Sequence, residues 1–471
     1  MQRNYRKSRQ HAKSTMQAPS SATFHITALT HDGRGIATYG KEHAQSDQYG
    51  KKAFIDFALP NETVKATINK SKKSFDEGWA THIITASKDR QSPVCQHFGV
   101  CGGCSLQHLD THQQILHKQS ILANHLRHHA GAEPSHWLPP VLGDCTGYRT
   151  KARLGVRHLK NGTLIMGFRE RASNFLTNID DCPILDCRIN QHLQELKDTL
   201  ITLDGKDSIT HLEFATGDAS SKVAMVVRHI KPLGKQDLGI LTEFCQQIDW
   251  QLYLQPKGAD STHRIDGADL PRSQTTPPTG GLFYELPDFN VMLECSPLDF
   301  TQINLSINRQ MIALACQLLD LQQGECVLDL FCGLGNFSLP MARCVGDSGR
   351  IVGVEGSQQM VERATMNAVA NGIHHATFYT HDLTQDFSNK PWVGHVDALL
   401  IDPPRAGAID VVRYLGKFNA KRLVYISCDP ATLARDSAVI IAQGYRLTHA
   451  GVMDMFCHTS HVESIARFEK I

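Results

Sequence analysis

The stretch VLDLFCGLGNFSLP, residues 327–340, decides the fold of the C-terminal part of this chain. Its apolar run ends at Phe331, and Gly333 and Gly335 then permit a tight turn in which the backbone can approach a nucleotide closely. The third glycine of a pyrophosphate-binding fingerprint would fall at Ser338. This departure disfavours a dinucleotide and favours a cofactor without a diphosphate.

Apolar runs and helical patterns alternate from about residue 291 to residue 471. The runs are ECVLDLF, RIVGVEG, ATFYTHD, VDALLID and RLVYISC, followed by YRLTHAGVMDMF and ESIARFE. This alternation predicts an α/β fold with a doubly wound, Rossmann-like sheet and ligands at the carboxyl ends of its strands. Glu355 ends the run after the glycine turn, where a carboxylate can accept hydrogen bonds from both ribose hydroxyls of a cofactor.

Cys428 ends another apolar run, in VYISCDPATLARD at 424–436, directly before a turn-forming Asp-Pro pair. A lone cysteine is more often a small buried hydrophobe than a reactive group. Three companion motifs point instead to catalysis: the glycine turn, LIDPPRAG at 400–407 and HTSHVES at 458–464. Together they resemble the RNA (uracil-C5)-methyltransferases, in which a cysteine attacks the pyrimidine ring and a methyl group arrives from S-adenosylmethionine.

The resemblance implies that Cys428 is the nucleophile and Glu463 the base. The chemistry needs both groups, because uracil C5 takes a methyl group only after a thiolate has added to C6, and a base must then remove the C5 proton. A free thiol has a pKa of about 8.5. We therefore expect positive charge or hydrogen-bond donors from Arg405, Arg435 or His458 to lower the pKa of Cys428.

The resemblance also assigns six residues to S-adenosylmethionine: Gln302, Phe331, Asn336, Glu355, Asp382 and Asp402. Asp382 stands where relatives often carry asparagine, and it would still accept a hydrogen bond from an adenine amino group. The Asp-Pro-Pro of residues 402–404 is also typical of amino-methyltransferases, which stack a following aromatic residue on a flipped base. Here that position is Arg405, and together with Cys428 it weighs against methylation of an exocyclic amine.

Three closely spaced cysteines, Cys95, Cys101 and Cys104, lie in SPVCQHFGVCGGCSLQH, and Cys182 follows in DDCPIL. Such spacing rarely reflects packing alone, and four thiolates suit either a zinc ion or an iron–sulfur cluster. The spacing leaves both open. The pattern resembles the [4Fe-4S] branch of the uracil methyltransferases, which implies a [4Fe-4S] cluster with a structural role, held by these four residues and not by Cys187.

The sequence divides into three predicted domains. Five short β-rich runs at 19–88 predict a small β-barrel of the OB type, and HDGRGIA followed by FIDFALPNETV resembles the TRAM domain of RNA-modifying enzymes. Residues 89–290 are predicted to form a mixed α+β central domain that carries the cysteine group. A Pro- and Gly-rich loop or hairpin at 257–281 precedes the methyltransferase domain at 291–471.

Composition limits the function less sharply. The 48 lysines and arginines balance 47 acidic residues, so any basic surface is local. Residues 1–18 carry five basic residues and no acid, which predicts a disordered tail for loose phosphate contact or for solubility alone. No run reaches the roughly 18 apolar residues of a membrane span. Fourteen cysteines without a signal peptide predict a cytoplasmic protein whose thiols are reduced, metal-bound or catalytic rather than disulfide-bonded.

The resemblance covers nearly all residues after the tail. Within the family, the chain most resembles the bacterial members that modify one uridine of 23S ribosomal RNA. We therefore predict a monomeric, cytoplasmic enzyme that methylates uracil C5 of a specific 23S rRNA uridine, with no membrane partner. Three alternatives stay open: a tRNA uridine or another rRNA uridine as substrate, a non-catalytic RNA-binding iron–sulfur protein, and a free-nucleotide methylase, for which the β-barrel would be superfluous.

Overall fold

The computed structural model describes residues 20–40, 49–219, 222–266 and 281–471. The predicted cationic tail at 1–18 lies outside the described residues, as does most of the predicted loop at 257–281. The chain divides into two compact units, Met1–Arg90 and Gln91–Ile471. None of the described helices combines the length and the apolar character that crossing a bilayer requires.

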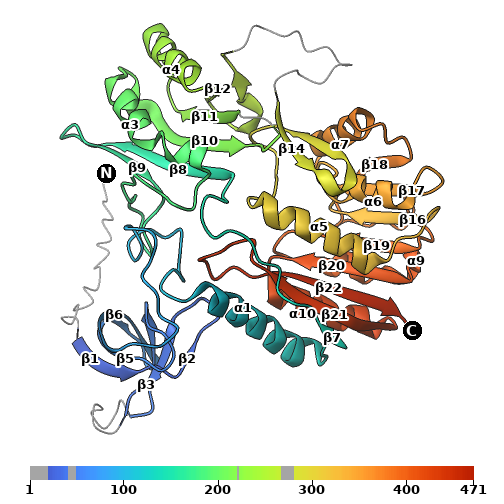
Figure 1. The fold of residues 1–471 in the computed structure, drawn as a ribbon, viewed down its shortest axis with the longest axis horizontal. Coiled ribbons are helices and arrows are strands. Elements are labelled where there is room, and N and C mark those ends of the chain that lie inside the picture. Colours follow the sequence, from blue (N-terminus) through green and yellow to red (C-terminus); the bar gives the residue numbers. More distant parts are fainter. Residues whose placement is uncertain (1–19, 41–48, 220–221, 267–280) are drawn as a thin grey trace, which may run out of the picture. The chain divides into compact units, whose positions relative to one another are not determined.

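The first unit contains one curled sheet of six strands (Figure 1). The strands are β1 (Ser20–His25), β2 (Ala28–Leu29), β3 (Gly35–Thr38), β4 (Lys52–Asp56), β5 (Thr63–Ser71) and β6 (Phe75–Thr85). They follow the order β1-β5-β6-β4-β3-β2, and each of the five predicted β-rich runs contains at least one of them. Burial alternates along β3 to β5, so one face packs around a small core that includes Ile26, Ile55 and Val64.

A second six-stranded sheet forms most of the predicted central region. Its strands are β8 (Lys151–His158), β9 (Leu164–Gly167), β10 (Ile209–Thr216), β11 (Val223–His229), β12 (Trp250–Gln255) and β13 (His263–Arg264), in the order β13-β12-β11-β10-β8-β9. Helices α2 (Cys187–Asn190), α3 (Leu193–Thr202) and α4 (Lys235–Gln247) lie between strands of this sheet in the sequence, and α3 and α4 share one hydrophobic core with the sheet. This region is mixed α+β, as predicted.

The last sheet has eight strands in the order β18-β17-β16-β19-β20-β22-β21-β7. They are β16 (Cys326–Leu330), β17 (Arg350–Glu355), β18 (Ala376–Thr380), β19 (Ala398–Ile401), β20 (Arg422–Ser427), β21 (Tyr445–Met453), β22 (Glu463–Lys470) and β7 (His136–Trp137). The first five strands in this order are parallel, and β22 is antiparallel to both β20 and β21. The strand order reverses beside β16, which is the topological switch of a doubly wound fold. The predicted α/β, Rossmann-like fold is confirmed.

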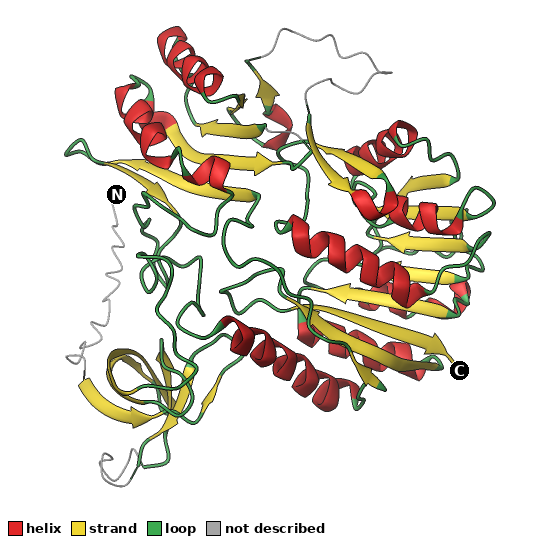
Figure 2. Cartoon of the chain, in the orientation of Figure 1, coloured by secondary structure: helices red, strands yellow, loops and turns green. Residues whose placement is uncertain are grey.

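Helices cover both faces of this sheet (Figure 2). Helices α5 (Leu305–Leu319), α6 (Ser338–Val345) and α7 (Gln358–Ala370) belong to the core on one face, and α8 (Ile409–Val412), α9 (Leu415–Phe418) and α10 (Pro430–Ala442) to the core on the other. The strands alternate between these cores: Ala398 and Leu400 face the first, and Leu399 and Ile401 the second. Burial on both faces explains why the strands read as continuous apolar runs.

Part of the predicted central region packs on the last sheet. Helix α1 (Thr111–His125) and the turn of π-helix after it (Leu126–Ala130) contribute to the same core as α10, and β7 extends the sheet beside β21. Asp110 starts α1 by accepting hydrogen bonds from the amides of residues 112 and 113. The hairpin of β14 (Leu282–Leu286) and β15 (Val291–Cys295) also joins the core of α5 to α7.

One expectation about the cysteines is wrong. Cys145, in the loop between β7 and β8, forms a disulfide with Cys457, in the loop between β21 and β22. The two Cα atoms lie 5.3 Å apart, although 312 residues separate them in the sequence. The prediction of no disulfides rested on the cysteine count and on the lack of a signal peptide, which carry no information about cysteines that only the tertiary fold brings together.

Candidate active site

The two predicted catalytic residues lie at the ends of adjacent strands. β20 ends at Ser427, which pairs with Ser464 of β22, so Cys428 and Glu463 lie just beyond that pair on neighbouring strands. The Ser464 hydroxyl donates to the Ser427 carbonyl at 2.9 Å and fastens the two strand ends. Asp429 caps α10 directly after Cys428, so the strand-to-helix turn presents the thiol at the carboxyl edge of the sheet.

The environment of Cys428 raises the pKa of its thiol to about 11. Burial is the largest cause, and the carboxylates of Glu463 and Asp402 add to it, whereas Arg405 and a backbone hydrogen bond at Cys428 oppose it. The expectation of a lowered pKa is therefore wrong, since desolvation and two acidic neighbours outweigh one guanidinium. Among the three candidates for lowering this pKa, Arg405 alone acts on the thiol.

The other two candidates are engaged elsewhere. Arg435 donates to the carboxylate of Asp436 and to the carbonyl of Ala406. His458 is buried, which lowers the pKa of its imidazole, and its ring and backbone contact Gln114. Neither residue is therefore a source of positive charge for Cys428.

The carboxyl groups beside Cys428 favour their protonated forms. Burial raises the pKa of Glu463 well above its usual range, Asp402 raises it further, and Arg405 lowers it. Burial also raises the pKa of Asp402 to about 7. A buried carboxylate is a stronger base than one in water, because it regains a favourable neutral state when it takes a proton. This edge can therefore accept and release protons near neutral pH.

Five of the six predicted cofactor residues follow parallel strands at the same edge of the sheet: Phe331 and Asn336 after β16, Glu355 at the end of β17, Asp382 after β18 and Asp402 after β19. The sixth, Gln302, lies half-buried in the loop between β15 and α5. Asn308 of α5 exchanges side-chain hydrogen bonds with Asn336 at 2.9 and 3.0 Å, which links this helix to the glycine loop. Five of the six residues thus lie at the carboxyl ends of β16 to β19, and Gln302 precedes the helix that contacts the glycine loop.

The glycine loop after β16 has the strained backbone that its sequence suggested. Phe331, Gly333 and Gly335 all have positive φ, at 67°, 55° and 96°. Glycine adopts this conformation at no steric cost, whereas Phe331 is an outlier of the kind found at functional sites. The carboxylate of Glu355 accepts hydrogen bonds from the amides of Gly333 at 3.2 Å and Ser357 at 3.0 Å, so it also holds the loop against the end of β17.

Two of the six side chains are occupied by local contacts. The amide oxygen of Asn336 accepts from the Tyr284 hydroxyl at 2.9 Å as well as from Asn308. Asp382 is exposed and accepts from the amide and hydroxyl of Thr384, which lower the pKa of its carboxyl group. Asp382 lies just after the end of β18, but its carboxylate is occupied by the hydrogen bonds from Thr384 in the same turn.

Sequence reasoning missed Asp329. This residue is buried at the end of β16 and accepts a hydrogen bond from Ser338, while its Oδ1 has no partner among the described residues. Burial, with Asp402 and Glu355 nearby, raises the pKa of its carboxyl group to about 8. An acid inside the apolar run VLDLF was the available sequence signal.

Sequence reasoning also missed the support of the loop at 402–408. Buried Asp436 of α10 accepts from the amide of Ala408 and from the hydroxyl of Tyr425, each at 2.7 Å. Together with the Arg435 bond to Ala406, these contacts fix the loop that presents Asp402 and Arg405. No local sequence pattern marks this network, because its members lie on β20, α10 and the loop.

The structure also brings the four predicted cluster cysteines together. Each of Cys101, Cys104 and Cys182 has its thiol pKa raised first by burial and then by one or more of the other thiols, to about 12 for Cys104 and about 11 for Cys182. Cys95 supplies part of this effect on all three. Cys187 is exposed at the start of α2 and is not among the groups that act on these thiols.

Gln107 supports the cysteine loop. Its Oε1 accepts from the amide of Cys95 at 3.0 Å. Its Nε2 is buried and has no hydrogen-bond partner in the described part of the chain, and the side chain lies beside the Cys104 thiol, whose pKa it lowers. The loop thus keeps a buried N–H donor next to sulfur.

A doubly wound sheet of this order, with a glycine loop and acidic strand ends at its carboxyl edge, defines a Rossmann-like methyltransferase domain. A family model described as tRNA (Uracil-5-)-methyltransferase matches residues 285–471. The chain is 53% identical over 463 residues to the 23S rRNA (uracil(1939)-C(5))-methyltransferase RlmD of Psychrobacter arcticus, covering 95% of this chain and 90% of that protein. It is 52% identical to the protein of the same name from Acinetobacter baylyi, covering 98% and 99%. The chain belongs to the RNA (uracil-C5)-methyltransferase family.

A solved structure shares the fold. The crystal structure of the tRNA (uracil-54, C5)-methyltransferase of Pyrococcus abyssi, in complex with S-adenosyl-L-homocysteine, matches with a TM-score of 0.68 over 95% of this chain and 100% of that chain. The two sequences are 21% identical, so this likeness concerns the fold alone.

Proposed function

We propose that this enzyme transfers a methyl group from S-adenosylmethionine to C5 of one specific uridine of 23S ribosomal RNA, giving 5-methyluridine. The observation that carries the proposal is the placement of Cys428 and Glu463 on neighbouring strand ends, with Asp402 and Arg405 beside them. The names of the relatives support 23S rRNA as the substrate.

In the proposed mechanism the thiolate of Cys428 adds to C6 of uracil, and C5 becomes nucleophilic enough to take a methyl group. S-adenosylmethionine, when bound, supplies that methyl group on a positively charged sulfonium. Glu463 then removes the proton from C5, and elimination releases Cys428. Burial suits Glu463 to this step, because the raised pKa of its carboxyl group makes the carboxylate a stronger base than a solvated glutamate.

The six residues around the carboxyl ends of β16 to β19 and before α5 are proposed to bind the cofactor. Glu355 would accept hydrogen bonds from ribose hydroxyls and Asp382 one from an adenine amino group, while Phe331 and Asn336 shape the glycine loop. Gln302, before α5, and Asp402, after β19, are the other two residues proposed to contact the cofactor. For Asp382 this role requires that its side chain leave Thr384.

We also propose that Cys95, Cys101, Cys104 and Cys182 hold a structural [4Fe-4S] cluster. Cys101, Cys104 and Cys182 are largely removed from water, and neighbouring thiols raise the pKa of each. A bound cation would stabilise all of these groups as thiolates. The unpartnered Gln107 Nε2 beside Cys104 fits a sulfur acceptor. Methyl transfer needs no electrons from the cluster.

The remaining parts complete the proposal. Residues 19–88 would be a TRAM domain that grips flanking RNA, 89–290 the central domain and 291–471 the methyltransferase domain, although α1 and β7 pack on the last sheet. The target uridine must leave any stack to reach Cys428, so a single-stranded loop of the RNA suits the site. We place the enzyme in the cytoplasm as a monomer.

Mapping of 5-methyluridine in ribosomal RNA tests the substrate. A deletion strain should lack one 5-methyluridine of 23S rRNA, and the wild-type gene should restore it, whereas a gene with Cys428→Ala should not. If the deletion strain keeps every 5-methyluridine of 23S rRNA but lacks one in tRNA, the substrate is tRNA and not 23S rRNA. An unchanged pattern in both RNAs would favour a non-catalytic RNA-binding protein.

A further inference from the structure

The Cys145–Cys457 disulfide lies close in sequence to the proposed base. Cys457 precedes Glu463 by six residues, in the loop that connects β21 to β22. We call residues 454–462 the β21–β22 loop. The disulfide joins this loop to the segment that leads into β8 of the central sheet. A covalent bond therefore joins the central region to the loop that leads into Glu463.

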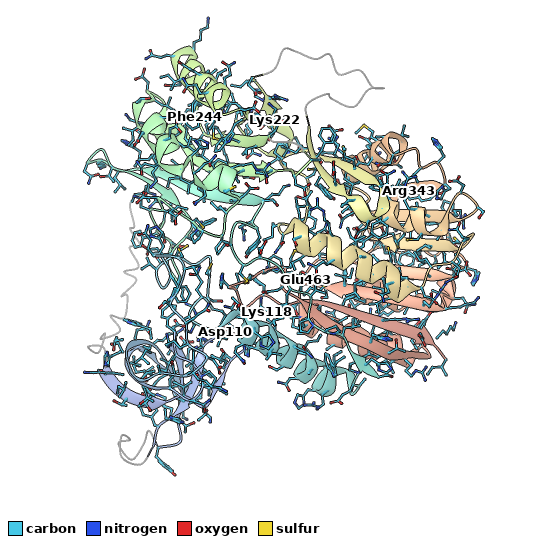
Figure 3. The ribbon with its side chains drawn as sticks, viewed as in Figure 1. Asp110, Lys118, Lys222, Phe244, Arg343 and Glu463 are labelled. Carbon is cyan, nitrogen blue, oxygen red and sulfur yellow. A yellow bond between two sulfur atoms is a disulfide. The ribbon has the colours of Figure 1, made fainter. Side chains whose placement is uncertain are left out.

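Helix α1 anchors the start of the β21–β22 loop. Figure 3 labels Lys118, a residue of α1. The ammonium group of Lys118 is buried and donates to the carboxylate of Asp454 at 2.7 Å and to the carbonyl of Phe456 at 3.0 Å. Breaking a buried ion pair by removing one partner leaves an uncompensated charge, so this anchor is rigid. It fixes residues 454–456 but lies before Cys457.

The cysteine loop anchors the middle of the β21–β22 loop. The carbonyl of His458 accepts from the amides of Ser105 and Leu106, both at 2.9 Å, and the His458 amide donates to Gln114 Oε1 at 2.9 Å. His458 has φ of 67°, so the backbone here is held in a conformation that a non-glycine residue seldom adopts. The chain direction after Cys457 depends on these contacts.

The central region holds Cys457 itself. The hydroxyl of Tyr148 donates to the Cys457 carbonyl at 3.0 Å, and the disulfide bonds the side chain of the same residue to Cys145. Tyr148 and Cys145 belong to one short segment before β8. The disulfide is the covalent member of this pair of contacts.

Glu463 has no comparable support of its own. Its side chain is buried, and the influences on its carboxyl group are burial and the charges of Asp402 and Arg405, with no hydrogen bond among them. Its position follows from the backbone, through the pairing of Glu463 with Met453 and of Ser464 with Ser427. A change in the path of the β21–β22 loop is therefore transmitted directly to the carboxylate.

We propose that the Cys145–Cys457 disulfide is a reversible cross-link that positions Glu463. The elimination step of methyl transfer is then faster when the disulfide is formed than when it is reduced. The inference rests on the proposed function. Cys145 and Cys457 are positioning residues in this scheme, since neither takes a proton from the substrate.

The redox step balances with a small disulfide as the oxidant. The thiolate of Cys145 attacks oxidised glutathione, releases one glutathione thiolate and forms a mixed disulfide. The Cys457 thiol then loses its proton, attacks the Cys145 sulfur and releases the second glutathione. Two protein thiols are oxidised, one small disulfide is reduced and two glutathione molecules result. Opening reverses these steps and starts at Cys145, which is half-buried, whereas Cys457 is fully buried.

The chemical test is thiol mapping on the full-length protein, purified without oxygen and with its iron content recorded. After treatment with oxidised glutathione, a peptide pair joined through Cys145 and Cys457 should appear. After treatment with dithiothreitol and unfolding, both cysteines should become alkylated. If the pair never forms, or if these residues bind stoichiometric zinc together with His458, the proposal is overturned.

The functional test compares elimination rates in single turnovers with unmodified RNA. The disulfide-closed wild type should release product roughly tenfold faster than the reduced wild type, a modest part of the roughly 10²-fold that 1 Å of misplacement can cost. The reduced form should also accumulate more of the denaturation-resistant protein–RNA adduct. A merely structural role would lower adduct formation and product release together.

Two variants sharpen this test. Cys145→Ser removes the disulfide without changing a residue of the β21–β22 loop. This variant should show slow elimination whether or not dithiothreitol is present. Cys187→Ser replaces an exposed cysteine elsewhere and should respond to thiol treatment as the wild type does. Equal elimination rates in the closed and reduced wild type would overturn the inference while methylation itself stands. Absence of both methylation and adduct in every form would overturn the proposed function and this inference with it.

Discussion

Two regions of this molecule carry the cysteines to which we assign functions, and the neighbours of their thiols differ. Cys428 lies beside two carboxyl groups and one opposing guanidinium at the open edge of the last sheet. Cys104 and Cys182 lie among other thiols, and their pKa values of about 12 and 11 follow first from burial and then from neighbouring thiols, which include Cys95 and Cys101 in both cases. Gathering thiols in this way is unfavourable unless a bound cation stabilises all of them as thiolates. The single thiol of Cys428, which has acidic neighbours, instead suits a covalent bond that forms and breaks within each reaction cycle.

The largest expected effect comes from removing the single thiol. Cys428→Ala should lower methylation by at least about 10⁴-fold, because no neighbouring group can form the covalent bond to C6. The melting temperature should stay close to that of the wild type, since the side chain is only half-buried. Methylation of 23S rRNA fragments and a thermal melt measure the two effects. Cys187→Ala is the matched control, and activity near the wild-type rate in Cys428→Ala would refute the mechanism.

The second effect concerns the carboxyl group beside that thiol. Glu463→Gln should slow complete turnover by roughly 10²- to 10⁴-fold, because proton removal from C5 loses its base while addition to C6 does not. A denaturation-resistant adduct should therefore accumulate on unmodified RNA. A gel under denaturing conditions, with labelled RNA, detects it. Inactivity without any adduct would assign Glu463 to folding or RNA binding.

The third effect concerns the group of four cysteines, Cys95, Cys101, Cys104 and Cys182. Anaerobically purified protein should contain about four irons per chain, and Cys→Ser at position 95, 101, 104 or 182 should remove them. The melting temperature should fall by about 5 °C or more, because metal binding contributes to folding. Iron analysis and visible absorption provide the measurement. Cys187→Ser should keep the cluster, and stoichiometric zinc in the wild type would contradict the assignment.

Local patterns were enough to predict the sheet and its functional edge. Each parallel strand is a mostly apolar run followed by a turn, so Glu355, Asp402 and Cys428 could be placed at strand ends from the sequence alone. The cysteine group is equally local, since three of its four members lie within ten residues. The strand ends and the clustered cysteines both depend on residues that are close together in the sequence, so local patterns are enough to predict them.

Long-range features escaped prediction for a common physical reason. The Cys145–Cys457 disulfide, the ion pair of Lys118 with Asp454 and the addition of β7 to the last sheet each join segments more than 300 residues apart. The raised pKa of Cys428 is also a tertiary property, because burial is its largest cause. Residue types suggested that Arg405, Arg435 and His458 would ionise the thiol, but only the fold shows which charges reach it.

The smallest expected effect tests the electrostatic side of the comparison directly. With a thiol pKa of about 11, Cys428 is almost entirely protonated at neutral pH, and its reactive thiolate fraction should rise about tenfold per pH unit below that value. Alkylation of Cys428 in the RNA-free protein, followed by peptide mass spectrometry from pH 6 to about pH 9, should show this slope.

The same measurement on Glu463→Gln separates reactivity from catalysis. Once Glu463 is ionised, its carboxylate raises the pKa of Cys428, so its replacement by a neutral amide should lower that pKa and speed alkylation at the alkaline end of the series, although methylation is nearly lost. Exposed Cys187 serves as an internal control and should be alkylated equally in both proteins. A flat pH profile for Cys428 would mean that the thiol is already ionised. Burial and acidic neighbours would then not govern the catalytic thiol, and the contrast between the two regions would rest on geometry alone.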